Sequence, residues 1–221
     1  MTSPQRPDSG ITRDPNRPAR LLRAEHDALL PILHRTPEAK FGNPTACPGW
    51  SVRDVLAHCS SALHRTITGD LHAFTPEQNE VDVAERRPWP VRDVLSELAT
   101  GYLNAGEPIA SAGGRLDGIA LGEWIHGGDV RDALGEPSAY ASEGYDDACA
   151  LLVERTRRRA IPLVEVQINE FRLVLGAATP DRQPATLHTD RSTLMRLVSG
   201  RPAEPTEYEL VGATAGELLV F

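Results

Sequence analysis

The stretch TACPGWSVRDVLAHCSSALHR, residues 45–65, carries the strongest fold signal in this chain. Turn-forming residues run up to Trp50, and Ser51 with Asp54 three residues later resembles a helix capping box with Asp in place of Glu. Beyond it, apolar side chains recur at intervals of three and four residues, which predicts one long amphipathic helix. The apolar positions are Val52, Val55, Leu56, Cys59, Leu63 and Ile67. His58 lies in the middle of this predicted helix.

Three further helices are predicted on either side of this one, at residues 20–35, 90–105 and 119–134. Each has apolar residues at helical spacing and is bounded by turn signals. Pro31 lies inside the first of them and either kinks that helix or ends it early. Four amphipathic helices in this part of the chain predict a helical bundle.

The pattern changes after residue 140, where one more helix at residues 142–159 precedes a strand-rich region. Alternating apolar and polar residues, with one change of register, predict strands in VEVQINEFRLVLG. We predict a further strand at ATLHTD, a short helix at RSTLMRLVSGR, and a closing hairpin formed by EYELVG and ELLVF.

These patterns divide the chain into three parts and place it in the α+β class. Residues 1–18 contain four prolines and almost no large apolar side chains, so we expect a disordered tail. Residues 19–140 are expected to form the helical bundle. Residues 141–221 are expected to form a small α+β domain.

The composition is that of an ordinary globular protein, with 221 residues of which 40% are hydrophobic and 24% charged. The formal net charge of -8 argues against non-specific nucleic-acid binding, which requires a basic surface. No apolar run approaches the ~20 residues of a membrane span, and the first residues lack the apolar segment of a secretory signal. Three widely spaced cysteines without a CxxC pair fit reduced thiols. We therefore expect a cytoplasmic protein with no nucleic-acid or membrane partner.

Two candidate metal ligands, Glu123 and His126, lie three residues apart in GEWIHGGDVRDALG, and Asp129 follows His126 by three residues. At this spacing Glu123 and His126 share a helix face, and a Glu-x-x-His pair is one way to present two metal ligands inside a bundle. Asp129 is placed to orient the His126 ring through a hydrogen bond. The alternative is a polar helix face with ordinary i,i+3 pairs.

His58, taken alone, is most simply a hydrogen-bonded structural residue beside an apolar stripe. Together with Glu123 and His126 it completes a three-ligand site with an open position, which is typical of a catalytic metal site. Arg65 follows His58 by seven residues, roughly two turns along nearly the same face. Arg201 follows the short C-terminal helix, and its fork is suited to a carboxylate, although a solvated surface charge is the simpler interpretation.

Cys47, in TACPGW, lies near the start of the predicted helix that carries His58, where the helix dipole is able to lower a thiol pKa. We interpret this thiol as a packing residue rather than a reactive one. Cys59 and Cys149 lie on apolar helix stripes and are interpreted as core residues as well.

The chain resembles the mycothiol-dependent maleylpyruvate isomerase family, a branch of the DinB-like metal-binding four-helix bundles, in the stretch TACPGWSVRDVLAH. The family's second metal segment is similar to IHGGDVRDALG, and the link after its second helix is similar to QNEVDVAERR. The small, sterol-carrier-like α/β domain often attached in this family is similar to TLHTDRSTLMRLVSGRP and ATAGELLVF. The resemblance extends from Arg20 to Phe221 and implies a DinB-like bundle followed by that domain.

Carried over residue by residue, the resemblance assigns the first metal histidine to His58 and the second to His126. The family's third ligand is an acid four residues before the second histidine, a position held here by Gly122. The nearest acid is Glu123, one residue later. Either Glu123 ligates through the i,i+3 geometry or the third ligand is lost. Arg201 lies in the segment through which the family's C-terminal domain contributes an arginine to the active site.

The resemblance also implies a chemistry. A divalent metal, most often zinc, accepts the thiol of mycothiol at its open position and lowers the thiol pKa. The thiolate then attacks a small electrophilic, carboxylate-bearing substrate, whose charge Arg65 or Arg201 would neutralise. The expected activity is mycothiol S-transfer or a thiol-dependent cis–trans isomerisation.

Other interpretations stay open at this point. The chain is alternatively a maleylpyruvate isomerase proper, or a non-catalytic binding or regulatory protein with a degenerate metal site. A metal-dependent hydrolase would use the same site with water in the open position. The oligomeric state is left open by the sequence.

Overall fold

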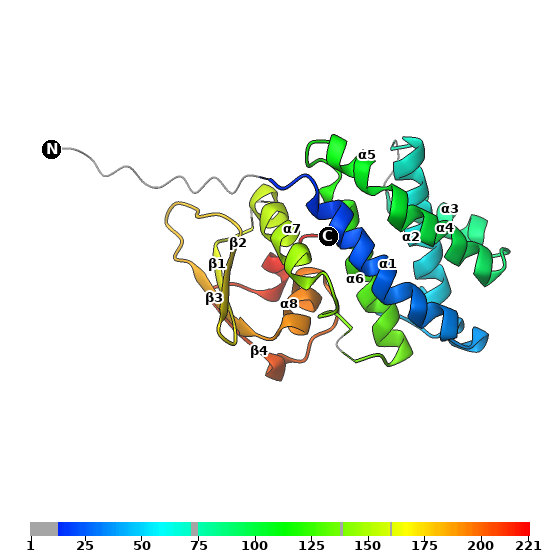
Figure 1. The fold of residues 1–221 in the computed structure, drawn as a ribbon. Coiled ribbons are helices and arrows are strands. Elements are labelled where there is room, and N and C mark those ends of the chain that lie inside the picture. Colours follow the sequence, from blue (N-terminus) through cyan, green and yellow to red (C-terminus); the bar gives the residue numbers. More distant parts are fainter. Residues whose placement is uncertain (1–12, 72–74, 138, 160) are drawn as a thin grey trace.

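A computed structural model describes residues 13–71, 75–137, 139–159 and 161–221. Helices make up the described chain before residue 140, and a helix-flanked sheet follows (Figure 1). The first group is α1 (Arg17–Arg35), α2 (Val52–Thr68), α3 (Pro76–Arg86), α4 (Val91–Asn104), α5 (Gly106–Ser111) and α6 (Asp117–Leu134). The second group is α7 (Tyr145–Arg158), β1 (Val164–Ile168), β2 (Phe171–Leu175), β3 (Ala185–Thr189), α8 (Arg191–Val198) and β4 (Tyr208–Val211).

Helix α2 begins as the sequence predicts, because Ser51 and Asp54 form both hydrogen bonds of the capping box. Its apolar stripe is buried from Val52 to Leu63, whereas Ile67 near the end of the helix is exposed. Helix α2 packs against α4, and Gly101 allows this close approach. A Cβ at Gly101 would lie 2.6 Å from the Leu63 Cβ, well inside van der Waals contact.

Pro31 does not end α1, which continues to Arg35. Leu29, Leu30 and Leu33 are buried on either side of it, so tertiary packing outweighs the local cost of proline. Helix α3 was not predicted from the sequence. Thr75 caps α3 by accepting a hydrogen bond from the Gln78 backbone N–H, 3.2 Å away.

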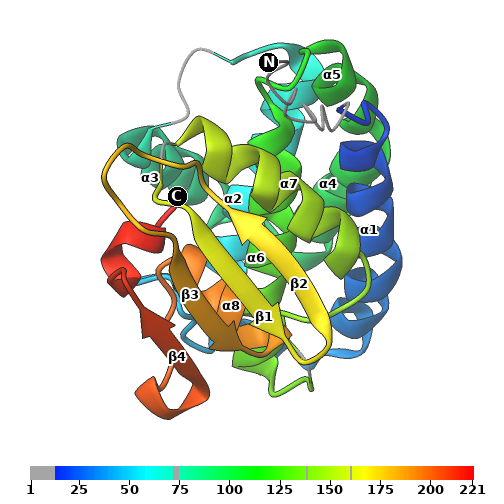
Figure 2. The same ribbon diagram turned by 90° about the vertical axis from the view of Figure 1, so that its left-hand side faces the viewer.

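The sheet has the strand order β2-β1-β3-β4, with β1 antiparallel to β2, parallel to β3, and β3 antiparallel to β4. Asn169, at a φ of 51°, forms the tight turn between β1 and β2. Helices α7 and α8 lie between the sheet and the bundle in both views (Figure 1 and Figure 2). Buried strand residues Val164, Val166 and Leu187 face these helices and extend the core of the bundle.

The predicted closing hairpin is wrong. Only its first half forms a strand, β4, and the residues after it form a 3-10 helix at Ala215–Leu218. Thr214 and Glu217 cap this turn through reciprocal hydrogen bonds, which favours helical over extended backbone. The chain then crosses to α8, where the Val220 N–H donates to the Val198 carbonyl at 3.0 Å.

The expected tail at residues 1–18 divides at residue 12. Residues 1–12 lie outside the described residues, but residues 13–18 are structured, with α1 beginning at Arg17. Arg13 forms a salt bridge of 2.7 Å with Asp117, because the start of α6 offers it a mostly buried carboxylate. The division at residue 140 stays a prediction, and buried residues from both sides of it belong to one hydrophobic core.

In the part of the chain that the structure describes, no helix is both long and apolar enough to cross a membrane.

Candidate active site

A pocket of about 600 Å³ lies between α2, α6, α7 and the start of α3. The three predicted metal ligands, His58, Glu123 and His126, all line it. Helix α2 contributes the first and α6 the other two, one turn apart on the same face as their spacing predicts. Gly122 also lines the pocket, so both this position and Glu123 face it.

The two histidine rings lie close together. Their centroids are 5.1 Å apart and the rings are nearly perpendicular, at 81°. Trp50 packs on the other side of His58, with ring centroids 5.0 Å apart. The two imidazoles are therefore close neighbours on the wall of the pocket.

Two buried polar atoms in this pocket lack a hydrogen-bond partner among the described residues, His58 Nδ1 and Glu123 Oε2. Burial, together with the charge of the neighbouring His126, lowers the pKa of His58 to about 3. Burial raises the pKa of Glu123 well above its ordinary value, although the Cys59 thiol donates a hydrogen bond to it. Burial thus disfavours the charged form of both side chains, and part of their hydrogen-bonding capacity is unused among the described residues.

On its other side the His126 ring forms a hydrogen bond through Nδ1. Its Nδ1 lies 3.0 Å from Oδ2 of Asp129, which is completely buried. Asp129 also accepts hydrogen bonds from the Tyr140 hydroxyl at 2.6 Å and from Arg201 Nη2 at 2.6 Å. Burial raises the pKa of Asp129, but hydrogen bonds from Arg201 and His126 more than offset this and hold it well below its ordinary value. An ionised Asp129 places the proton on Nδ1, so that Nε2 of His126 keeps its lone pair.

Arg201 lies in this network rather than at the surface. Its Nε donates to Asp129 Oδ1 at 2.9 Å and its Nη1 to the Ser199 carbonyl at 2.7 Å. Its fork therefore holds a carboxylate of the protein itself. Arg65, in contrast, pairs with Asp82 at 3.2 Å and Asp70 at 3.7 Å. Arg65 is not among the described residues that line the pocket, so the structure does not bring it to the site.

Cys47 packs against the same network, with its Sγ 3.1 Å from Asp129 Oδ2 and 3.6 Å from His126 Nδ1. Burial and the charge of Asp129 raise the pKa of this thiol to about 12, so it donates to the carboxylate. Cys47, His126 and Asp129 offer ligand atoms within 4.8 Å of one another. Arg201 Nη2 lies 3.5 Å from the sulfur, however, and a cation at that place disfavours a metal ion.

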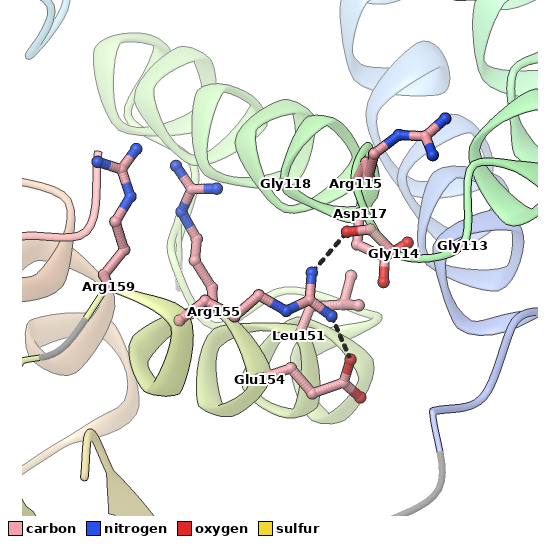
Figure 3. A pocket seen from close by; sticks show the side chains of 10 residues that line it. Gly113, Gly114, Arg115, Asp117, Gly118, Leu151, Glu154, Arg155 and Arg159 are labelled. Carbon is pink, nitrogen blue, oxygen red and sulfur yellow. Dashed lines mark hydrogen bonds and ion pairs between the residues drawn. The ribbon is translucent and has the colours of Figure 1, made fainter.

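Three arginines that were not predicted as site residues from the sequence also line the pocket, Arg115, Arg155 and Arg159. A second hollow of about 630 Å³ adjoins the pocket and shares these arginines and Gly118 with it (Figure 3). The basic run RTRRR at the end of α7 was the available signal. Its helical spacing places Arg155 and Arg159 on one face, but only the packing of α7 shows what that face contacts.

Comparisons with known proteins agree with this fold. Residues 22–126 match the family model described as the mycothiol maleylpyruvate isomerase N-terminal domain. A crystal structure of the mycothiol-dependent maleylpyruvate isomerase is similar, with a TM-score of 0.57 and 14% identity over 91% of this chain and 95% of that chain. A histidine-to-alanine mutant of that enzyme gives a TM-score of 0.56, also at 14% identity, over 91% of this chain and 95% of that one. At this identity the structures show a shared fold. No curated protein sequence matches the chain.

Proposed function

Because this chain belongs to the mycothiol maleylpyruvate isomerase family through its N-terminal domain, we propose that it is a metal-dependent enzyme that uses mycothiol as a nucleophile. The observation that carries the proposal is the pair of unpartnered buried atoms, His58 Nδ1 and Glu123 Oε2, in one pocket with His126. A bound cation would provide an interaction partner for these two groups, which have none among the described residues.

His58, Glu123 and His126 are the residues that would hold the metal, and two imidazoles with one carboxylate fit zinc. The departure from the family pattern at Gly122 is tolerated in this proposal, because the i,i+3 spacing also brings Glu123 into the pocket. A bound divalent ion would supply a positive charge that lowers the pKa of the mycothiol thiol near neutral pH.

The remaining residues position the ligands. Asp129 holds the Nδ1 proton of His126 and so directs Nε2 toward the pocket. Arg201 favours the ionised form of Asp129, and the hydrogen bonds from Tyr140 and Arg201 fix the carboxylate in place. Arg201 thus acts through Asp129 in this proposal, rather than on the substrate directly.

The reaction proposed is addition of the thiol to an electrophilic carbon of a small carboxylate-bearing substrate. In S-transfer the new carbon–sulfur bond is kept. In isomerisation the adduct rotates about the former double bond and expels the thiol, so no thiol is consumed. Maleylpyruvate isomerisation itself is the second candidate, favoured by the structural similarity over 91% of the chain.

The first test is metal content by elemental analysis of protein purified without a histidine tag, beside a His58→Ala, His126→Ala double variant. We expect near-stoichiometric divalent metal in the wild type and its loss in the variant. A wild type that stays metal-free after incubation with zinc would overturn the proposal in favour of a non-catalytic binding protein.

A second measurement separates the reaction types. The metal-loaded protein is given mycothiol and an electrophilic cis-alkene acid, and both thiol and alkene are followed. Loss of thiol indicates S-transfer, whereas trans product with constant thiol indicates isomerisation. Turnover that is independent of mycothiol would contradict the proposal and support a hydrolase.

A further inference from the structure

The arginines at the edge of the pocket lack acidic partners. Among the described residues, no carboxylate lies within ion-pair distance of Arg115, Arg155 or Arg159. The nearby acids are engaged elsewhere, since Asp117 pairs with Arg13 at 2.7 Å and Glu154 with Arg17 at 2.7 Å. The cationic edge is therefore not neutralised by the part of the protein that the structure describes.

Arg155 is held in place by contacts that leave its two outer nitrogens without a hydrogen-bond partner among the described residues. Its Nε donates to the Val220 carbonyl at 2.8 Å, and its guanidinium lies 4.5 Å from the centroid of the Phe221 ring. A side chain at Gly118 would collide with Nη1 of Arg155, so the glycine lets the guanidinium lie over α6. A fork fixed in this way loses little conformational entropy when it binds a carboxylate.

Arg159 extends beside Arg155 and follows directly after the end of α7. Figure 3 shows the two side chains next to each other, with their guanidinium groups pointing the same way. Burial lowers the pKa of Arg155, and the charges of Arg159 and Arg158 lower it further. Like charges thus face one another at this edge, and an anion bound between them would relieve their repulsion.

The position of this edge relative to the proposed ligands follows from α6. Gly118 precedes Glu123 by five residues and His126 by eight, which is about 7.5 and 12 Å along a helix axis. The arginines and the ligands line one pocket. A small acid is able to span this distance with its carboxylate at one end and its reactive carbon near the other.

We propose that Arg155 and Arg159, with Arg115 in the same pocket, bind the carboxylate of the electrophilic substrate. They would thereby orient its reactive carbon toward the proposed metal ligands Glu123 and His126. This inference rests on the proposed function and assigns the substrate-binding role to these arginines instead of Arg65 and Arg201. It also gives the enzyme a preference for acids over their neutral esters.

Direct binding of an unreactive acid tests this without catalysis. Succinate and its neutral dimethyl ester are titrated calorimetrically into the full chain at low salt, as purified and again after metal removal. We expect saturable succinate binding in both forms and none of the ester. In Arg159→Gln or Arg115→Gln, both exposed positions, succinate affinity falls about tenfold or more. Arg157→Gln, an exposed control on α7 outside the pocket, keeps wild-type affinity.

Unchanged succinate affinity in Arg159→Gln and Arg115→Gln would overturn the inference, as would binding that disappears with the metal. The second result would mean that the carboxylate binds the ion. Because the metal-free protein is also titrated, failure of the arginine proposal can be distinguished from failure of the proposed metal-dependent function.

Kinetics with two maleimides, one carrying a carboxylate and one neutral, then test whether the bound carboxylate belongs to the electrophile. With mycothiol as thiol, Arg159→Gln should raise KM about tenfold for the charged maleimide and leave the neutral one unchanged. Arg155→Lys, which keeps the charge but not the fork, should give a smaller rise. An equal rise for both maleimides would overturn the inference, because the carboxylate would then not belong to the electrophile.

Discussion

The two sides of the His126 ring differ in how completely the protein satisfies them. On one side Asp129 is completely buried, ionised, and bonded to His126, Tyr140 and Arg201. On the other side burial disfavours the charged forms of His58 and Glu123, and each keeps a buried atom without a hydrogen-bond partner among the described residues. Buried polar groups are normally paired. We therefore interpret the Asp129 side as the part that fixes the orientation of His126, and the side of His58 and Glu123 as the part that binds a ligand.

Breaking the satisfied side should have the largest effect. Asp129→Asn removes the buried charge that neutralises Arg201, so we expect the free energy of unfolding to fall by about 3–5 kcal/mol. Urea denaturation of the metal-free protein measures this. The control is Asp132→Asn, since Asp132 pairs with Arg196 at 2.7 Å on the surface and should cost at most about 1 kcal/mol. Equal losses in the two variants would show that the Asp129 network is not special.

Changing the unsatisfied side should affect metal binding more than folding. Glu123→Gln keeps the size of the side chain and an acceptor oxygen, so the metal-free protein should lose less stability than it does in Asp129→Asn. Zinc affinity should fall about 100-fold or more, because even losing a partner of a ligand costs about 10–100-fold. Competition with a chelating dye measures the affinity, with the exposed Glu107→Gln as control. Wild-type zinc affinity in Glu123→Gln would remove Glu123 from the ligand set.

The buried neutral state of His58 predicts a smaller, pH-dependent effect. Its pKa is about 3 in the fold and about 6.5 in the unfolded chain, so the unfolded state binds more protons between these values. Stability is therefore full above about pH 6.5 and is lost as the pH falls toward 3. From pH 7 to 5 the metal-free protein should lose about 2 kcal/mol through this group. Urea denaturation at the two pH values should show a smaller loss in His58→Phe, and the same loss in both proteins would contradict the assignment.

Local patterns in the sequence were enough to predict the helices that carry the site. The capping box at Ser51, the apolar stripe of α2 and the one-turn spacing of Glu123 and His126 depend on neighbours in the chain. They therefore appear in the structure as predicted. Helix α3 and the 3-10 turn at Ala215–Leu218 were missed because their short capping signals were weaker than the patterns around them.

Contacts between distant residues could not be predicted in this way. Arg201 lies 72 residues from Asp129 in the chain, and only tertiary packing turns it from a candidate surface charge into the clamp of a buried carboxylate. The same holds for Arg155 and Arg159, which the docking of α7 beside α6 brings to the pocket edge.

The sequence by itself determined which side chains share a helix face, because helical periodicity is fixed by backbone geometry. It thus placed Glu123 with His126, and His58 on the middle of α2. The tertiary structure decided which of these groups are satisfied and which are left without partners. That outcome depends on desolvation and on distances between elements far apart in the chain, and no local pattern encodes either.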